Sequence, residues 1–220
     1  MPGDLSGWRV LVTAGGTREP IDPVRYIGNH SSGKMGLAVT AEAADRGADV
    51  TLVTTVETVD TGATIIRVET AQEMAESVWG LAPRQDVVVM VAAVADFRPA
   101  APSAEKIRRR DGLQVIELEP TPDILLGVSE KAPDALVVGF AAEAGSLDRA
   151  REKAMTKGVD LLVANDVLAE GSGFGTDTNQ VTIFYPDGST EPWPLLTKAE
   201  VATRLWDAVV RVRQASEPRQ

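Results

Sequence analysis

The sequence contains no cysteine and only one histidine, His30. Disulfides, thiolate metal sites and a cysteine nucleophile are therefore excluded, as is a zinc site built on two imidazoles. No apolar run approaches the ~20 residues that a membrane-spanning helix needs. Residues 1–4 lack the basic flank and apolar core of a signal peptide, so we expect a cytoplasmic protein.

Positive charge is also scarce. Lysine and arginine together number 22 against 32 aspartates and glutamates, which gives a formal net charge of -10. Repulsion therefore argues against nonspecific binding to nucleic acid or to an anionic membrane. The apolar share of 44 % and the charged share of 25 % are ordinary for a folded globular protein. We expect residues 1–220 to form a single domain with a sizeable core.

Short apolar segments alternate with amphipathic ones along most of the chain. We expect strands over residues 8–13, 49–54, 64–68, 86–91, 135–140 and 160–164, and helices over 34–46, 71–81, 147–157 and 197–213, with one more helix after Pro122. This alternation predicts an α/β fold with a mostly parallel sheet and helices on both faces. Segments 181–185 and 190–193 flank Pro-Asp-Gly and predict a short β-hairpin near the C-terminus. Residues 113–118 are expected to form another short strand.

The loops after the predicted strands are the expected ligand sites, because ligands of such sheets lie beyond the carboxyl ends of the strands. The first loop is far longer than the ~2–6 residues that a plain connection needs. It ends at a predicted helix start near Gly33, where free backbone N–H groups and the helix dipole favour an anion. Ser31 and Ser32 are typical helix caps. We predict a phosphate site at Ser31, Ser32 and Gly33; a capped helix without a ligand is the alternative.

Two familiar nucleotide motifs fit this first loop incompletely. Residues 28–34 spell G-x-x-x-x-G-K, but the eighth position of a phosphate-binding P-loop should be Ser or Thr, and here it is Met35. The pair Gly15-Gly16 lacks the third glycine of a dinucleotide fingerprint. The second predicted strand ends in Thr54-Thr55, where an acidic residue should bind the ribose. A P-loop and a nicotinamide site are therefore disfavoured.

Further candidate residues lie in later segments. Asp96 follows the small residues 92–95 and suits a nucleotide hydroxyl, a base or a magnesium ion, although a turn former is the alternative. Residues 105–110 form the densest cationic run, and we interpret Lys106 as part of a mobile lid, with a solvated loop as the alternative. Lys153 and Lys157, spaced i and i+4, project to one side of a helix and could equally be a solvated face.

The combination of these segments resembles the phosphopantothenate–cysteine ligase family. The similarity runs from about Val10 to Arg213, nearly the whole chain. The segments that carry it are residues 17–36 (TREPIDPVRYIGNHSSGKMG), 92–97 (AAVADF), 105–107 (EKI), 122–125 (PDIL), 139–143 (GFAAE) and 164–166 (AND). The resemblance implies a Rossmann-like homodimer that works in two steps. The phosphopantothenate carboxylate first attacks the α-phosphorus of a nucleoside triphosphate, and the cysteine amine then attacks the acyl nucleotide. In bacterial members the nucleotide is CTP, used with Mg²⁺.

The resemblance also implies roles for individual residues. Lys106 would stabilise charge during transfer to phosphorus, Asn29 would hold the acyl group, and Arg25 and Ala93 would support its conversion. The residues implied around CTP are Met90, Val91, Ala92, Asp96, Lys106, Pro122, Asp123, Ile124, Leu125, Phe140, Lys153 and Lys157.

Assembly and the competing interpretations stay open in the sequence. We expect the predicted hairpin to add apolar area to the dimer. Bacterial relatives are often fused behind a flavin-dependent decarboxylase, so the chain is expected to be either free-standing or one half of such a protein. A nicotinamide- or flavin-dependent oxidoreductase and a noncatalytic nucleotide-binding module remain the alternatives.

Overall fold

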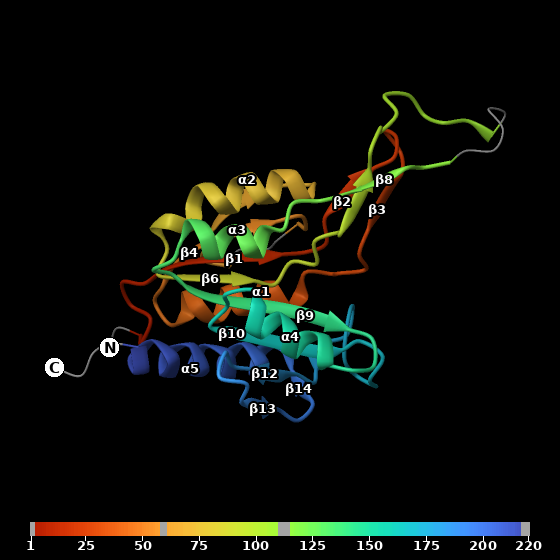
Figure 1. Ribbon diagram of the computed structural model, residues 1–220. Helices are drawn as coiled ribbons and strands as arrows, with labels where there is room; N and C mark the ends of the chain where they lie inside the picture. The colour runs from red at the N-terminus through yellow and green to blue at the C-terminus, as the bar shows by residue number, and fades with distance from the viewer. Residues whose placement is uncertain (1–2, 58–60, 110–114, 217–220) are drawn as a thin grey trace.

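An eight-stranded sheet runs through the middle of the molecule in the computed structural model, which describes residues 3–57, 61–109 and 115–216 (Figure 1). Its order is β13-β12-β10-β9-β6-β1-β4-β5. The strands are β1 (Arg9–Ala14), β4 (Asp49–Thr54), β5 (Thr64–Arg67), β6 (Val87–Met90), β9 (Leu136–Glu143), β10 (Leu161–Asp166), β12 (Thr182–Phe184) and β13 (Thr190–Pro192). All neighbours from β10 to β5 pair in parallel, whereas β12 and β13 add an antiparallel edge. The predicted α/β fold with its mostly parallel sheet is confirmed.

Helices cover both faces of this sheet, and each face has its own hydrophobic core. One face carries α1 (Lys34–Asp45) and α5 (Lys198–Ser216); the other carries α2 (Ala71–Leu81), followed by the 3-10 turn η1 (Ala82–Arg84), together with α3 (Ile124–Lys131) and α4 (Asp148–Thr156). In β1, Val10 and Val12 point to the first core and Leu11 to the second, as the strand period requires. From Val10 to Ala14 both sides of the strand are buried, which explains its largely apolar sequence.

Local sequence signals account for the main helices. Helix α2 begins with a capping box, in which the Thr70 side chain accepts from the Glu73 backbone and the Glu73 side chain accepts from the Thr70 backbone. Its buried residues, Ala71, Met74, Ala75 and Val78, follow the helical spacing. In α5, Trp206 is completely buried, and its indole N–H donates to the Val39 carbonyl of α1 at 2.9 Å. This contact ties the last helix to the first.

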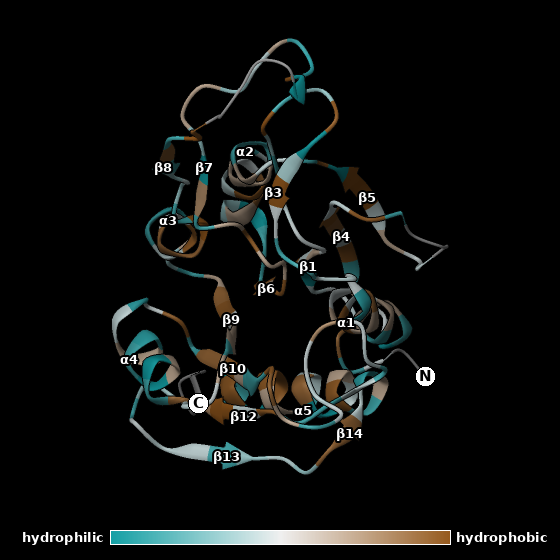
Figure 2. Ribbon diagram, turned by 90° about the vertical axis from the view of Figure 1, so that its right-hand side faces the viewer, coloured by the Kyte–Doolittle hydropathy of each residue, from teal (hydrophilic) through white to brown (hydrophobic). Residues whose placement is uncertain are grey.

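Two small antiparallel pairs project from the carboxyl edge of the main sheet, at the upper right of Figure 1 and the top of Figure 2. They are β2 (Arg18–Pro20) with β3 (Tyr26–Gly28), and β7 (Phe97–Pro99) with β8 (Leu118–Pro120). We call the described residues of 18–28 and 97–120 the arm. The prediction of a strand over residues 113–118 was wrong. Residues 113 and 114 lie outside the described residues, 115–117 are not extended in a sheet, and β8 begins only at Leu118.

The predicted C-terminal hairpin is present, but it belongs to the main sheet. Strand β12 pairs with β10, and β13 pairs with β12. Its large apolar side chains, Val181, Ile183, Phe184 and Trp193, are all buried within the chain. These side chains are therefore not available as apolar area for a dimer interface, contrary to the expectation from the sequence. Another short antiparallel pair, β11 (Thr178–Asn179) with β14 (Leu196–Thr197), joins the loop before the hairpin to the start of α5. Among the described residues, no helix combines the length and the apolar character needed to cross a membrane.

Candidate functional site

The candidate site lies at the carboxyl ends of β1, β6, β9 and β10, as expected for a parallel sheet. Two buried threonines organise the segment that follows β6. The Thr13 hydroxyl accepts from the backbone N–H of Val91 at 3.1 Å and of Ala92 at 3.0 Å. The Thr17 hydroxyl accepts from the Ala95 N–H at 2.9 Å. Because these N–H groups are satisfied, the segment can leave the sheet and still line a cavity with small residues.

The larger of two adjoining pockets has a volume of about 530 Å³. It gathers ten of the residues implied around a nucleotide: Met90, Ala92, Asp96, Pro122, Asp123, Ile124, Leu125, Phe140, Lys153 and Lys157. Asn29 and Ala93 line the same pocket. Val91 instead lines the smaller pocket, and Lys106 lines neither. Segments that lie far apart in the sequence therefore share one cavity.

Charged side chains in the larger pocket are partly paired. Lys153 Nζ lies 2.9 Å from the Glu143 carboxylate, and Lys157 forms an ion pair with Asp123. Asp123 also caps α3, because its side chain accepts from the Leu126 N–H at 3.1 Å. Burial acts to raise the pKa of Asp123, but the hydrogen bonds from Lys157 and Leu126 outweigh it and lower that pKa. Both lysines thus line the pocket, and each is paired with one carboxylate.

Asn29 connects the first loop to the segment after β6. Its amide donates to the carbonyls of Ala93, at 3.2 Å, and of Val94, at 3.1 Å. The approach between the two segments is close, since a Cβ at Gly16 would lie only 2.8 Å from the Asn29 carbonyl oxygen. Gly16 also pairs with Ala93 in an isolated parallel bridge. The predicted partners Asn29 and Ala93 therefore lie side by side in the wall of the larger pocket.

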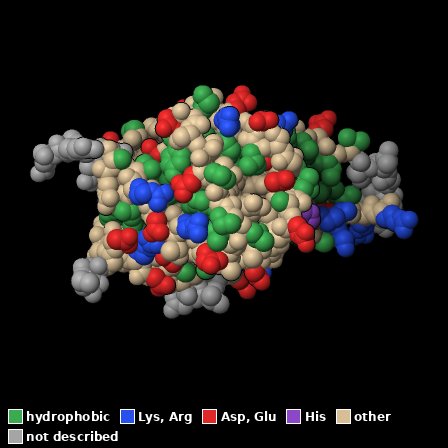
Figure 3. Space-filling model, turned by 90° about the horizontal axis from the view of Figure 1, so that it is seen from below, with side chains coloured by type: hydrophobic (Ala, Val, Ile, Leu, Met, Phe, Trp, Pro, Cys, Tyr) green, Lys and Arg blue, Asp and Glu red, His purple; other side chains and the backbone are tan. Residues whose placement is uncertain are grey.

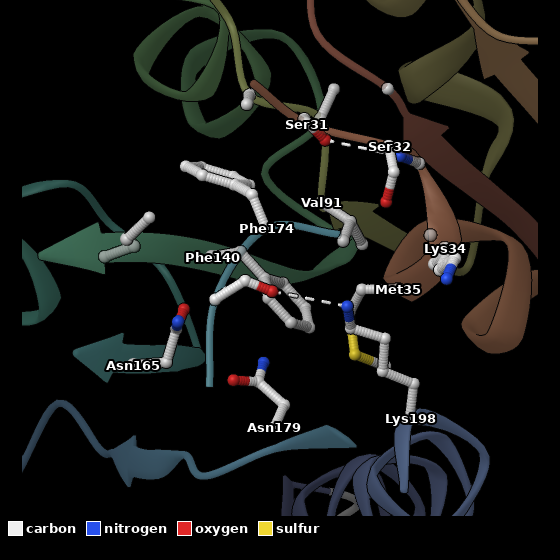
Figure 4. A pocket seen from close by; sticks show the side chains of 18 residues that line it. Ser31, Ser32, Lys34, Met35, Val91, Phe140, Asn165, Phe174, Asn179 and Lys198 are labelled. Carbon is white, nitrogen blue, oxygen red and sulfur yellow. Dashed lines mark hydrogen bonds between the residues drawn. The ribbon is translucent and has the colours of Figure 1, made fainter. Parts of the chain in front are cut away.

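The smaller pocket lies at the start of α1 and contains the predicted phosphate residues (Figure 4). Ser31 and Ser32 lie on one side and Asn165 and Asn179 on the other, with Phe140 between them. The expectation that a serine caps α1 was wrong. The N-cap residue is Gly33, whose left-handed φ of 76° suits glycine, and α1 has no side-chain cap bond.

Two lysines that the sequence analysis did not select also line the smaller pocket. Lys34 and Lys198 are the first residues of α1 and α5, where the helix dipole disfavours a cation. Lys34 pairs with Asp177 at 2.6 Å. Lys198 is buried and donates to the carbonyls of Gly173 and Thr176, and Figure 4 shows it reaching from α5 toward Met35 and Phe140. Burial lowers the pKa of Lys198, and the like charge of Lys34 acts in the same direction. No motif in the sequence marks Lys198, whereas Lys34 is the lysine of the incomplete P-loop pattern of residues 28–34.

Arg25 and Lys106 lie on the arm, outside both pockets. Arg25 forms an ion pair with Asp22 and also donates to the Ile107 carbonyl at 2.9 Å. Figure 3 shows the blue Lys and Arg side chains gathered at the arm end of the molecule, beside the only histidine. Within one chain, the structure therefore brings Asn29 and Ala93 to the pocket but not Arg25 or Lys106. The last residue of the predicted cationic run, Arg110, lies outside the described residues.

Metal ligands are sparse in the described ranges 3–57, 61–109 and 115–216. No group of three or more His, Asp or Glu side chains is placed to hold a metal ion there. Asp96 is exposed in the larger pocket, and its carboxylate has no partner among the described residues. It could add a ligand to a cation that arrives with a phosphate.

Comparison with known proteins gives a consistent result. The family model of the DNA/pantothenate metabolism flavoprotein C-terminal domain matches residues 5–212. The coenzyme A biosynthesis bifunctional protein CoaBC of Bacillus subtilis is 41 % identical over 98 % of this chain and 54 % of its own length. The CoaBC of Mycobacterium tuberculosis is 47 % identical over 96 % of this chain and 54 % of its own length. The chain thus spans about half the length of these curated relatives.

Solved structures are similar as well. The crystal structure of the C-terminal domain of a CoaBC protein has a TM-score of 0.81 and 41 % identity, with 96 % of this chain and 100 % of that chain covered. The DNA/pantothenate metabolism flavoprotein of Streptococcus pneumoniae has a TM-score of 0.78 and 25 % identity, with the same coverage. By sequence and by fold, the chain belongs to the family of the DNA/pantothenate metabolism flavoprotein C-terminal domain.

Proposed function

We propose that this chain is the ligase that joins 4′-phosphopantothenate to L-cysteine in coenzyme A biosynthesis. The observation that carries the proposal is the larger pocket, where ten residues implied around a nucleotide meet Asn29 and Ala93. The relatives named as coenzyme A biosynthesis proteins support the same pathway. An oxidoreductase has less support, because β4 ends in threonine where a dinucleotide fold needs a ribose-binding acid.

The proposed reaction has two steps. In the first, a carboxylate oxygen of phosphopantothenate bonds to the α-phosphorus of CTP, the bond to the β-phosphate breaks, and pyrophosphate leaves. In the second, the cysteine nitrogen bonds to the acyl carbon, CMP leaves, and the amine loses a proton. Both reacting groups come from substrates, so the protein must supply position and charge compensation. The absence of a cysteine or a histidine pair is therefore compatible with this chemistry.

The two pockets divide the ligands between them. CTP occupies the larger pocket, where Lys153 and Lys157 can exchange their carboxylate partners for phosphate oxygens. The smaller pocket takes a phosphate group beside Ser31, Ser32 and the uncapped start of α1. Asp96 would be an available carboxylate for a Mg²⁺ ion bound to the nucleotide, and the ion would offset phosphate charge there, since Mg²⁺ favours phosphate oxygens plus one or two carboxylates.

The position of Arg25 and Lys106 on the arm favours a homodimer. Exposed apolar side chains accompany them on the arm: Val24, Tyr26, Phe97, Val115, Ile116 and Leu118. A second copy would cover this surface and hold the cations of one arm near a pocket of the other chain. We expect Lys106 to act as a lid, so hydrogen exchange around it should slow when CTP binds. Light scattering at assay concentration should give a dimer mass, and a monomer mass would contradict it.

We also propose a cytoplasmic location, on the composition of the chain, and a flavin-dependent decarboxylase as the functional partner. The bifunctional names and double length of the relatives support this partner, either on the same polypeptide or separate.

The ligase activity is tested by incubating the protein with phosphopantothenate, L-cysteine, Mg²⁺ and either CTP or ATP. We expect phosphopantothenoylcysteine by mass spectrometry, with faster turnover on CTP. Equal or better use of ATP would overturn the base preference alone. No product with either nucleotide, together with nicotinamide reduction in a spectral assay, would replace the ligase with an oxidoreductase.

A further inference from the structure

A buried carboxylate holds together the two cationic segments of the arm. Asp22 lies in the turn between β2 and β3, and its side chain is 0 % exposed. One oxygen accepts from the backbone N–H of Val24 and of Arg25, each at 2.9 Å. The other accepts from the Arg25 guanidinium, with Nε at 3.0 Å, and from the backbone N–H of Ile107 at 3.2 Å. All of its acceptor positions are therefore in use.

The contact with Ile107 joins parts of the chain 85 residues apart. Arg25 completes it from the other side, because Nη2 donates to the Ile107 carbonyl at 2.9 Å. The peptide groups of residue 107 are thus held at the N–H by Asp22 and at the C=O by Arg25. Nearby, the Ser103 N–H donates to the Ile21 carbonyl at 2.9 Å. Lys106 directly precedes this fixed residue, so its backbone follows the tip of the β2–β3 hairpin.

The turn alone does not require a charge at this position. Accepting from two N–H groups within one turn is a task that asparagine performs as well as aspartate. A buried carboxylate costs free energy unless it is paired and hydrogen-bonded. Here the hydrogen bonds of Arg25 lower the pKa of Asp22 far below its usual range, although burial acts in the opposite direction. We therefore attribute the need for a negative charge to the contacts of Asp22 with the Arg25 guanidinium and with the Ile107 N–H.

We propose that Asp22 is a positioning residue that holds Arg25 against the Ile107 segment and so fixes where the chain that carries the lid residue Lys106 is attached. This inference rests on the proposed ligase function, in which both cations act on the substrates. Asp22 itself touches neither substrate. It sets the direction of the Arg25 guanidinium and the location of the Lys106 backbone, so the two cations reach the reaction together.

The test compares Asp22→Asn and Asp22→Ala with Glu119→Gln as the matched control. Glu119 is another arm carboxylate paired with an arginine, Arg98, at 2.8 Å, but it does not contact the Ile107 segment. Hydrogen exchange of the Ile107 amide is measured first, because it needs no activity. We expect exchange at least about 10-fold faster in Asp22→Ala, since its acceptor is removed, and unchanged exchange in the control.

Single-turnover kinetics follow with phosphopantothenate, CTP and cysteine. A misplacement of about 1 Å can cost up to about 100-fold, so Asp22→Asn should slow pyrophosphate release and amide formation together, each by about 10- to 100-fold. If Asp22 acts through Arg25, its effect on amide formation should vanish in an Arg25→Gln background. Circular dichroism and thermal unfolding identify any variant that fails to fold. If Asp22→Ala does not fold, Asp22→Asn, which keeps one oxygen acceptor, is used in its place.

Three results would overturn the inference: unchanged exchange at Ile107 in Asp22→Ala, faster exchange with both steps at the wild-type rate, or additive effects of Asp22→Asn and Arg25→Gln. A wild-type protein that releases no pyrophosphate would instead refute the ligase proposal. The exchange of Ile107 would still decide whether Asp22 holds the segment.

Discussion

Replacing Asn29 with aspartate should loosen the wall of the larger pocket in a pH-dependent way. Both hydrogens of the Asn29 amide are engaged by the carbonyls of Ala93 and Val94. In Asn29→Asp, a carboxylate without a hydrogen to donate would face these two carbonyl oxygens at neutral pH. We therefore expect the first loop and the segment after β6 to move apart.

The size of the effect follows from the two hydrogen bonds. Each is worth about 0.5–1.5 kcal/mol, so their loss lowers the free energy of unfolding by about 1–3 kcal/mol. Asn29 is exposed, which lets water replace part of the loss and favours the lower end. For a chain of this size, each 1 kcal/mol lowers Tm by about 2–4 °C. In catalysis, a mispositioned acyl group should slow amide formation by about 10²–10³, while pyrophosphate release continues.

Asn29→Ala is the matched control, because it loses the same hydrogen bonds without adding a charge. The carbonyls should raise the pKa of the new carboxyl above its unfolded value of about 3.9. A group with a raised folded pKa binds more protons when folded, so the stability of Asn29→Asp relative to Asn29→Ala should fall as pH rises through that pKa. Thermal unfolding between pH 4 and pH 8 measures this difference. Equal stability of both variants at every pH would refute the reasoning, as would loss of pyrophosphate release in Asn29→Asp.

Three further predictions concern the pocket and its support. Lys153→Met should raise the KM for CTP by about 10-fold in steady-state kinetics, because it removes a proposed phosphate partner and leaves the Glu143 carboxylate unpaired. An unchanged KM would contradict a role of Lys153 in CTP binding. Gly36→Ala should destabilise the chain by about 1–3 kcal/mol in denaturant unfolding, since the added Cβ would meet the backbone of β1 at 2.9 Å; wild-type stability would contradict this packing. The pKa of Asp123 is lowered, so the stability from its pairing with Lys157 is present above the unfolded pKa of about 3.9 and is lost as pH falls through the folded pKa. When the stability of each protein is expressed relative to its own value at neutral pH, acid unfolding should therefore start at higher pH in the wild type than in Asp123→Asn. Identical acid-unfolding profiles would contradict a stabilising role of this ion pair.

The fold was largely predictable because its signals are local. Continuous apolar strands such as β1, the Thr70 capping box and the Pro-Asp-Gly turn each depend on neighbouring residues alone. The arm was not predictable in the same way. Strands β2, β3, β7 and β8 have three residues each, which is too short for a recognisable alternating pattern, and β2, β7 and β8 also include proline and a charged residue. Their pairing follows from the tertiary structure.

The residues of the candidate site also fall into those that local sequence signals select and those that only the tertiary structure reveals. Residues in contiguous signature segments, such as Asn29 and Asp96, could be selected from the sequence. Lys198 could not, because a single lysine at a helix start gives no sign that it is buried beneath a pocket. Asp22 lies within the recognisable first segment, yet its contact with Ile107 spans the chain and has no periodic signature. Sequence patterns therefore identified segments that line the two pockets but not the contacts that orient them.

The most direct test of the ligase proposal is a rapid-quench experiment without cysteine. The protein is mixed with phosphopantothenate, CTP and Mg²⁺, and pyrophosphate and acyl nucleotide are quantified together. We expect a burst of both products in equal amounts, limited to about one per active site, followed by amide formation only when cysteine is added. Pyrophosphate release that requires cysteine, or no acyl nucleotide at any time, would contradict the two-step ligase mechanism.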